Sequence, residues 1–246
     1  MKPYLLGAAL SLVAASLCTA AEHHAHWDYT DPSGPDHWAD LAPENHLCRS
    51  GARQSPIDIH DVVEADLAPL TFDYPASAAR VLNNGHTIEV TPSNTGRVTL
   101  ASGNYSLVQF HFHSSSEEKI RGKAYPLVAH LVHRNSSGEL AVIALLFEVG
   151  AQNPALAPLL AAMRDEAGAS QNLDHLNLAH LLPAKRDYFA YIGSLTTPPC
   201  SEGVRWHVLT TPVSLSETQL NAFRALYPMN ARPVQPLNGR TVHLGG

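Results

Sequence analysis

The sequence predicts a mainly β protein made of a single domain, with a few short helices. Its 246 residues are enough for one good-sized domain and marginal for two. Eighteen prolines and fifteen glycines are spread along the chain, which favours short strands and turns over long helices. Hydrophobic residues make up 45% of the chain and can form a substantial core. No repeat, low-complexity block or linker divides the chain, so we expect one domain.

The strands are predicted from short apolar runs that are separated by groups of turn residues. The strand-like runs cover residues 87–91, 97–100, 106–113, 127–134 and 140–149. Groups rich in Asn, Gly and Ser favour turns at residues 83–85, 93–96, 101–104 and 135–138. Residues 31–55 are rich in Pro, Gly and polar residues, and we expect them to form an irregular segment that wraps the domain.

Two short helices are predicted in the second half of the chain. Residues 154–164 fit a helix that has Pro154 near its first turn, where proline is tolerated. Residues 216–226 fit a second helix, which Ser214 or Ser216 would cap.

The N-terminus is typical of an export signal. Lys2 supplies positive charge, and residues 5–17 form an apolar run that is short for a membrane span. Small residues follow, which predicts a signal peptide over residues 1–20 with cleavage after Ala20 or Ala21. A retained membrane anchor is the alternative. No other long apolar run follows, so we expect no membrane contact after cleavage.

Cysteine and charge restrict the kind of protein further. Cleavage removes Cys18 and leaves Cys48 and Cys200, and an even pair in an oxidising compartment predicts a disulfide. Two buried free thiols are the alternative. The net charge of −6 and the pI near 6.2 argue against nucleic acid as a partner.

Histidines are many for this size, fifteen in all, and a group of them has the spacing of metal ligands. Alternation along a strand places His111 and His113 on the same side, with Phe110 and Phe112 on the other. The run at residues 128–133 offers a third ligand, His130 or His133, and spacing alone does not choose between them. Three neutral histidines leave a fourth position open for water, which is typical of catalytic zinc sites. Histidines that are merely packed in the core are the alternative.

Eight motifs, taken together, resemble the α-class carbonic anhydrases. They follow the order of that family over almost the whole chain after the signal, and the pair HFH and SLTTPPC is the most specific. The motifs are WDY (27–29), GPDHW (34–38), RQSPIDI (53–59), NNGH (83–86), QFHFH (109–113), HLVH (130–133), GSLTTPPC (193–200) and RPVQPL (232–237).

The resemblance implies an α-carbonic anhydrase domain over residues 21–246, with a large, twisted, mostly antiparallel central sheet. It implies a Zn²⁺ cofactor and reversible hydration of carbon dioxide to bicarbonate and a proton by a zinc hydroxide. It selects His130 as the third ligand, gives His133 a structural role and pairs Cys48 with Cys200, as in bacterial members. By analogy with those members the protein is expected to be periplasmic or secreted, as a monomer or homodimer.

The resemblance also assigns roles to other side chains. Thr196 and Glu117 form the pair that orients the zinc hydroxide, and His86 is the proton shuttle, for which its ordinary pKa of about 6.5 is suitable. Gln109 is placed behind the ligands. The residues matched to the substrate pocket are Val132, Val142, Leu195, Thr197 and Trp206.

The chain departs from the family behind the third ligand. The family usually has a glutamate two residues before it, and here that position is Val128. The family often has histidine after the orienting glutamate, and here it is Glu118. We hypothesise that Glu118 orients His130 instead; the alternative is that Glu118 faces solvent.

Two other functions stay open at this stage. One is a carbonic anhydrase-like zinc-binding protein with little or no activity. The other is a zinc scavenger, suggested by His23, His24 and His26.

Overall fold

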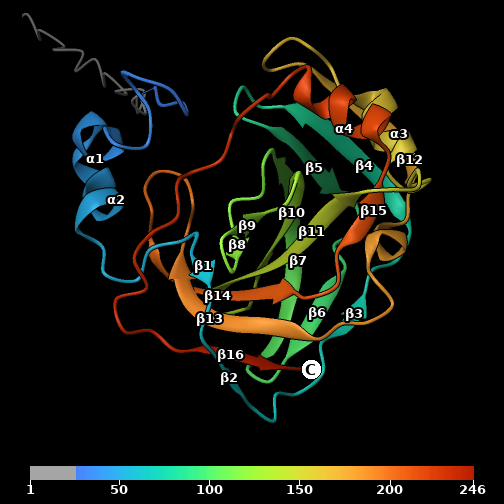
Figure 1. Cartoon of the computed structure of the whole chain (residues 1–246). Helices are drawn as coiled ribbons and strands as arrows, with labels where there is room; N and C mark the ends of the chain where they lie inside the picture. Colours follow the sequence, from blue (N-terminus) through green and yellow to red (C-terminus); the bar gives the residue numbers. More distant parts are fainter. Residues whose placement is uncertain (1–25) are drawn as a thin grey trace, which may run out of the picture.

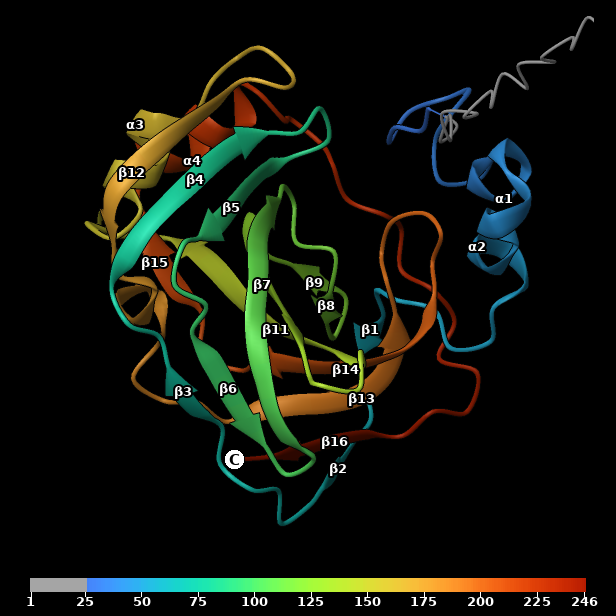
Figure 2. The ribbon, with the colours of Figure 1, turned by 180° about the vertical axis from the view of Figure 1, so that it is seen from behind.

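A single large sheet dominates the computed structural model, which describes residues 26–246. The predicted signal peptide, its cleavage sites, Cys18, His23 and His24 lie outside the described residues. The sheet has 13 strands, and its main path runs β12-β4-β5-β7-β10-β11-β14-β13-β16-β2. Figures 1 and 2 show β4 and β16 near opposite ends of the sheet running in clearly different directions, so the sheet is strongly twisted.

Short strands make up most of the chain. In the large sheet they are β2 (Val62–Glu64), β3 (Thr71–Asp73), β4 (Ser77–Asn83), β5 (Ile88–Pro92), β6 (Arg97–Leu100), β7 (Gly103–His113), β10 (Leu127–Arg134), β11 (Leu140–Val149), β12 (Ser170–Leu176), β13 (Tyr188–Ser194), β14 (Glu202–Leu209), β15 (Val213–Leu215) and β16 (Val242–Gly245). A separate small sheet holds β1 (Asp58–Ile59), β8 (Lys119–Ile120) and β9 (Lys123–Ala124).

Most strand pairs are antiparallel, as expected. The parallel pairs in the large sheet are β11 with β14, β11 with β15, and β16 with β2, and in the small sheet β1 is parallel to β8. The predicted mainly β fold with a large, mostly antiparallel sheet is therefore confirmed.

The helices are few and short. They are α1 (Trp38–Leu41), α2 (Leu47–Ser50), α3 (Ala157–Ala162) and α4 (Glu217–Arg224), with 3₁₀ turns at Pro43–His46 and Leu178–Leu181. In α4 the Ser216 side chain accepts from the Gln219 N–H and Gln219 reaches back to the Ser216 N–H, a capping box. Ser216 is thus the cap, and Ser214 is not.

Two local expectations were wrong. Residues 31–55 are not wholly irregular, because α1 and α2 form there around the buried Trp38 and Cys48; helices of four residues are too short to leave a periodic signal. The helix expected over 154–164 is only Ala157–Ala162, since Asn153 Oδ1 binds the Ala155 N–H in a turn and Met163 is already extended.

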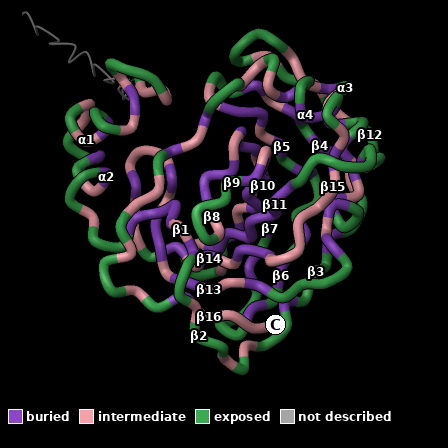
Figure 3. The backbone as a smooth tube through the Cα atoms, viewed as in Figure 1, coloured by how far each residue is buried: buried purple, intermediate pink, exposed green. Residues whose placement is uncertain are grey.

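The two faces of the sheet carry different side chains. One face, with Phe110, Leu131 and Ile143, forms the larger apolar core, which Phe223 of α4 also enters. The other face carries the second apolar cluster, with Val128, Val142 and Trp206. Figure 3 shows the middle strands as the most continuously buried part of the chain. Within residues 26–246 no helix has the length and hydropathy of a membrane span.

A disulfide joins α2 to the loop that follows β13. Cys48 of α2 is bonded to Cys200, which follows β13, and their Cα atoms are 5.0 Å apart. The predicted pair is confirmed. Arg232 is buried beside it and donates from Nη2 to the Cys48 carbonyl at 2.9 Å.

Candidate metal centre

Strand register brings three histidines together on the second face of the sheet. His111 pairs with His130 across β7 and β10, and Val128 pairs with His113. Paired residues on neighbouring strands point to the same face. His111, His113 and His130 each offer a ring nitrogen, and these nitrogens lie within 4.8 Å of one another.

His133, the other histidine of β10, is placed differently. It points to the opposite face, where its Nε2 lies 2.7 Å from the Tyr74 hydroxyl and its ring is fully buried. Burial lowers the pKa of His133 to about 3. The structure therefore brings His130, and not His133, to the other two histidines.

Two of the histidines are held from behind through Nδ1. His111 Nδ1 lies 2.9 Å from Oε1 of Gln109, and His113 Nδ1 lies 2.7 Å from the carbonyl oxygen of Asn230. These contacts leave Nε2 of each ring free to face the centre. Among the described residues, buried His113 Nε2 has no hydrogen-bond partner.

His130 is held through its other ring nitrogen, Nε2. Its Nε2 lies 3.0 and 3.2 Å from the two carboxylate oxygens of Glu118, so that Nδ1 faces the centre. Glu118 is fully buried, and it belongs to the loop between β7 and β8. Val128 is buried in the apolar cluster and offers the ring no polar partner.

Burial keeps two of the rings neutral. It lowers the pKa of His111 to about 3 and that of His113 well below the ordinary value. For His130 burial also lowers the pKa, but the pairing with Glu118 outweighs it, and the pKa is raised. Three imidazole nitrogens, each on a ring fixed from behind, fit the nitrogen ligands and open fourth position of a catalytic zinc ion.

Glu117 lies directly beside the centre. Its Oε1 accepts a hydrogen bond from the Arg232 N–H at 2.8 Å. Its Oε2 lies 3.5 Å from His113 Nε2 and 3.7 Å from His130 Nδ1. Burial raises the pKa of Glu117 to about 7, against the lowering effects of the nearby His130 and Thr196 side chains.

An apolar wall adjoins the histidines. Register places Val132, Val142 and Trp206 in one row across β10, β11 and β14. The Trp206 ring lies edge-on to the His130 ring, with the ring centroids 4.9 Å apart. Trp206 Nε1 donates to the Ser194 carbonyl at 3.0 Å. Leu195 packs against the same cluster.

The Thr196–Cys200 loop follows directly after β13. The Leu195 N–H donates to the Ser201 carbonyl at 3.0 Å, and the Cys200 N–H donates to the Thr197 carbonyl at 2.8 Å. Thr196 is buried, and Thr197 is partly exposed. The disulfide therefore anchors the loop that carries both threonines.

His86 lies on the turn between β4 and β5, half-buried. Its N–H and the Thr87 N–H both donate to Asn84 Oδ1 at 2.9 Å. The ring stacks on Trp27, with centroids 3.8 Å apart and planes 6° from parallel, and His26 is 6.4 Å away. Burial lowers the pKa of His86.

Sequence reasoning missed two residues near the centre. Asn230, which supports His113, lies in an irregular segment with no periodic pattern to indicate it. Glu89 is paired with His111 across β5 and β7, and burial raises its pKa. An alternating pattern on residues 87–91 could have placed Glu89 on one face, but not beside His111.

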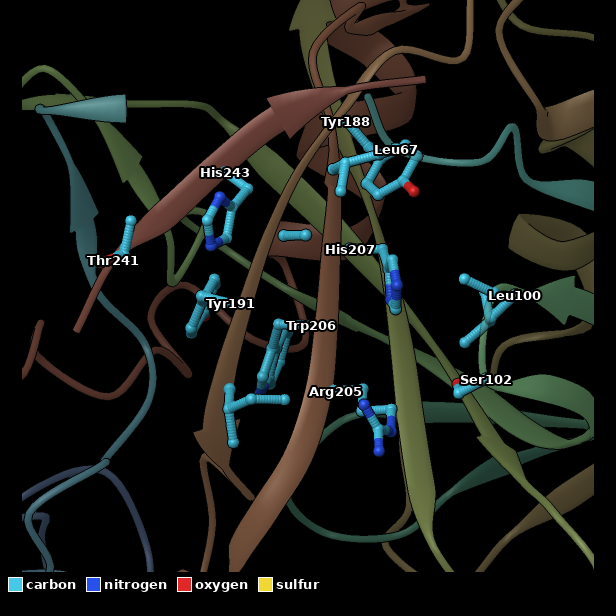
Figure 4. Close-up of a pocket in the computed structure, with 13 residues that line it drawn as sticks. Leu67, Leu100, Ser102, Tyr188, Tyr191, Arg205, Trp206, His207, Thr241 and His243 are labelled. Carbon is cyan, nitrogen blue, oxygen red and sulfur yellow. The ribbon is translucent and has the colours of Figure 1, made fainter. Parts of the chain in front are cut away.

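A separate cavity of about 280 Å³ lies on the back of β13 and β14. Figure 4 shows Arg205, His207 and His243 around it. Arg205 and His207 flank Trp206 along β14, so they point to the face opposite His130. The cavity contains none of the three clustered histidines.

Comparisons with known proteins give the same fold and the same family. The sequence model of the family described as eukaryotic-type carbonic anhydrase matches residues 33–245. The carbonic anhydrase of Pectobacterium atrosepticum is 39% identical over 233 residues, covering 94% of this chain and 96% of that protein.

Two solved structures superpose closely. The α-carbonic anhydrase from Thermovibrio ammonificans, in complex with the inhibitor sulfanilamide, is 47% identical with a TM-score of 0.87, covering 89% of this chain and 99% of that one. Dioscorin complexed with ascorbate is 32% identical with a TM-score of 0.84, covering 89% and 97%.

The family match spans most of the chain, and the curated relative aligns over nearly its whole length. The large sheet and the histidine cluster lie within the matched residues. The chain therefore belongs to the eukaryotic-type, or α, carbonic anhydrase family of enzymes.

Proposed function

We propose that this protein is a zinc enzyme that converts carbon dioxide and water reversibly to bicarbonate and a proton. The observation that carries the proposal is the set of three histidine ring nitrogens within 4.8 Å, each ring fixed by a hydrogen bond from behind. His111 and His113 would hold the metal through Nε2, and His130 would hold it through Nδ1. In carbonic anhydrases, the reference case for this chemistry, zinc lowers the pKa of a bound water to about 7.

The apolar wall would bind the substrate. Val132, Val142, Leu195 and Trp206 present hydrocarbon and an aromatic edge next to His130, and they offer no charge to compete with the reaction. A small apolar molecule such as carbon dioxide is favoured there over water. Thr197, at the edge of the same loop, would contact the substrate or product.

Glu117 and Thr196 would orient the nucleophile. The Arg232 N–H fixes Glu117 Oε1, which leaves Oε2 to accept a hydrogen bond from the Thr196 hydroxyl. With its own proton donated to Glu117, the Thr196 oxygen can only accept from a group at the centre. That fixes the direction of the attacking lone pair.

Each hydration also produces a proton that must leave the buried site. His86 is half-buried, and although burial lowers the pKa of its ring from the ordinary value, an imidazole there can accept a proton from inside and release it to buffer. We assign His86 this role.

The activity is tested by stopped-flow hydration of carbon dioxide with the fully zinc-loaded protein, with and without acetazolamide. His111→Ala, prepared in the same way, is the matched control. We expect inhibitor-sensitive hydration by the wild type and little by the variant. The second candidate function is a zinc-binding protein of this fold with weak or no activity, and zinc-loaded wild type that fails to hydrate carbon dioxide would establish it.

Glu118 is proposed to replace the usual carboxylate support of the third ligand. Its two contacts with His130 Nε2, at 3.0 and 3.2 Å, support this, as does the apolar setting of Val128. Losing such a partner typically costs about 10–100-fold in metal affinity. Glu118→Gln should therefore release zinc faster by a factor of that order.

Two further variants sharpen the test of Glu118. Exposed Glu64→Gln is the matched control and should release zinc at the wild-type rate. Adding Val128→Glu to Glu118→Gln returns a carboxylate to the same face of β10, two residues from His130, and should restore slow release. Release from Glu118→Gln as slow as from wild type would contradict the role.

We also propose that residues 1–20 direct export, so that the enzyme works in the periplasm or outside the cell. The disulfide supports an oxidising compartment. The mass of the protein recovered from the periplasm should correspond to a chain starting at Ala21 or Glu22. A full-length mass would contradict cleavage. The expectation of a monomer or homodimer stays a prediction for sedimentation analysis.

A further inference from the structure

Asn230 connects parts of the site that are far apart in sequence. It lies in the segment between α4 and β16, 117 residues after His113, and it is 1% exposed. Figure 1 shows this segment, in red, leaving α4 and passing down one side of the molecule to β16.

The backbone of Asn230 holds the end of β7. Its carbonyl oxygen lies 2.7 Å from His113 Nδ1, and its N–H donates to the Ser114 carbonyl at 3.0 Å. The side-chain Oδ1 accepts from the Ser114 N–H at 2.8 Å. Both the N–H and the carbonyl of Ser114 are therefore bound by Asn230, which fixes this end of β7 to the segment between α4 and β16.

The side-chain amide of Asn230 reaches the turn that carries His86. Nδ2 donates to the Phe112 carbonyl and to the His86 carbonyl, both at 3.0 Å. Both amide hydrogens are thus used, one on β7 and one on the turn. The His86 carbonyl is partly buried, and losing its donor there costs free energy, so the amide holds the turn against β7.

We propose that Asn230 is a positioning residue whose side-chain amide fixes the His86 turn relative to β7. The inference rests on the shuttle role proposed for His86. Other contacts also hold the turn in place: the Thr87 hydroxyl donates to the Phe112 carbonyl, and Trp27 stacks on the His86 ring. Loss of the amide should therefore displace the turn without unfolding it.

The backbone and the side chain of Asn230 respond differently to substitution. Every variant at position 230 keeps a backbone carbonyl, so Asn230→Ala should keep the His113 contact and the wild-type rate of zinc release. It removes both Nδ2 bonds, so the proton-transfer step should slow while hydration itself does not. The kcat should fall, by up to about 100-fold, the loss that a misplacement of about 1 Å can cause. The kcat/KM should stay unchanged, and added imidazole buffer should restore kcat.

A structural readout tests the placement without the reaction. The Trp27 ring stacked 3.8 Å from His86 should shift the His86 ring protons upfield in the NMR spectrum. Asn230→Ala should reduce that shift. The matched control is Asn153→Ala, which also removes a nearly buried Asn whose Nδ2 donates to a carbonyl, but whose contacts are with Ser214 and Gln219 and not with the histidines. It should change neither the shift nor kcat. If Asn230→Ala does not fold, Asn230→Ser is measured in the same way.

Four outcomes separate the possibilities. A reduced His86 ring shift, lower kcat and unchanged kcat/KM support the inference. Parallel loss of kcat and kcat/KM with faster zinc release would overturn it, since the side chain would then serve the metal centre alone. An unchanged ring shift would overturn it as well. His86→Ala with wild-type kcat would instead refute the proposed shuttle, and the ring shift would still decide what Asn230 positions.

Discussion

The disulfide gives a prediction whose size follows from the structure. Replacing both Cys48 and Cys200 by alanine removes a cross-link between residues that are 152 positions apart. In the chain-entropy model, releasing a loop of this length stabilises the unfolded chain by about 5 kcal/mol. That is a large part of the roughly 5–15 kcal/mol that holds a typical domain together.

Native contacts near the disulfide should keep the fold in place when the cross-link is absent. Gln54 Nε2 donates to the Cys200 carbonyl at 3.0 Å, and Arg232 donates to the Cys48 carbonyl at 2.9 Å. Neither bond needs the sulfur atoms. We therefore expect the variant to fold, to bind zinc and to lose stability mainly through its freer unfolded state.

Urea unfolding followed by tryptophan fluorescence measures the effect. The free energy of unfolding should fall by several kcal/mol, and the m-value should rise because the unfolded chain exposes more surface without the cross-link. Wild type in dithiothreitol should resemble the double variant. A loss below about 1 kcal/mol, with m unchanged, would refute the entropic reasoning.

Three further predictions concern stability. Burial lowers the pKa of His207 to about 4, so between pH 6.5 and 4 the unfolded chain binds a proton that the folded chain does not, and stability falls with falling pH by at most about 1.4 kcal/mol per unit. Urea unfolding from pH 7 to 5 should show a shallower loss for His207→Leu, and equal slopes would contradict this. Ser216→Ala removes the α4 cap and should lower the unfolding free energy by about 1 kcal/mol in the same assay, whereas Thr218→Ala, without that contact, should not. Phe110→Ala empties a fully buried position and should lower it by about 3–5 kcal/mol; a change below 1 kcal/mol would mean that the site collapses around the gap.

Alternation along strands made much of the site predictable. Period-two spacing placed His111 and His113 on one side, and the strands at 97–100, 127–134 and 140–149 were predicted with the bounds that the structure has. Spacing could not choose between His130 and His133. That choice depends on which face of β10 meets the histidine face of β7, a matter of register between strands.

Contacts from irregular segments were harder to predict. Glu118 follows β7 in a loop, where no periodicity fixes the direction of a side chain, so its contact with His130 could only be hypothesised. Asn230 and the Trp27–His86 stack join segments that are distant in sequence, and a local pattern carries no information about such pairs. The family resemblance added roles for matched positions, but it could not show that Glu118 lies beside His130.

The central claim is that one zinc ion, held by His111, His113 and His130, makes this protein a carbon dioxide hydratase. The most direct test is to titrate the metal-free protein with zinc while recording the rate of carbon dioxide hydration. The account predicts a rate that rises in proportion to zinc and stops rising at one equivalent per chain. A rate that stays at the uncatalysed value at full loading, or that keeps rising well beyond one equivalent, would contradict it.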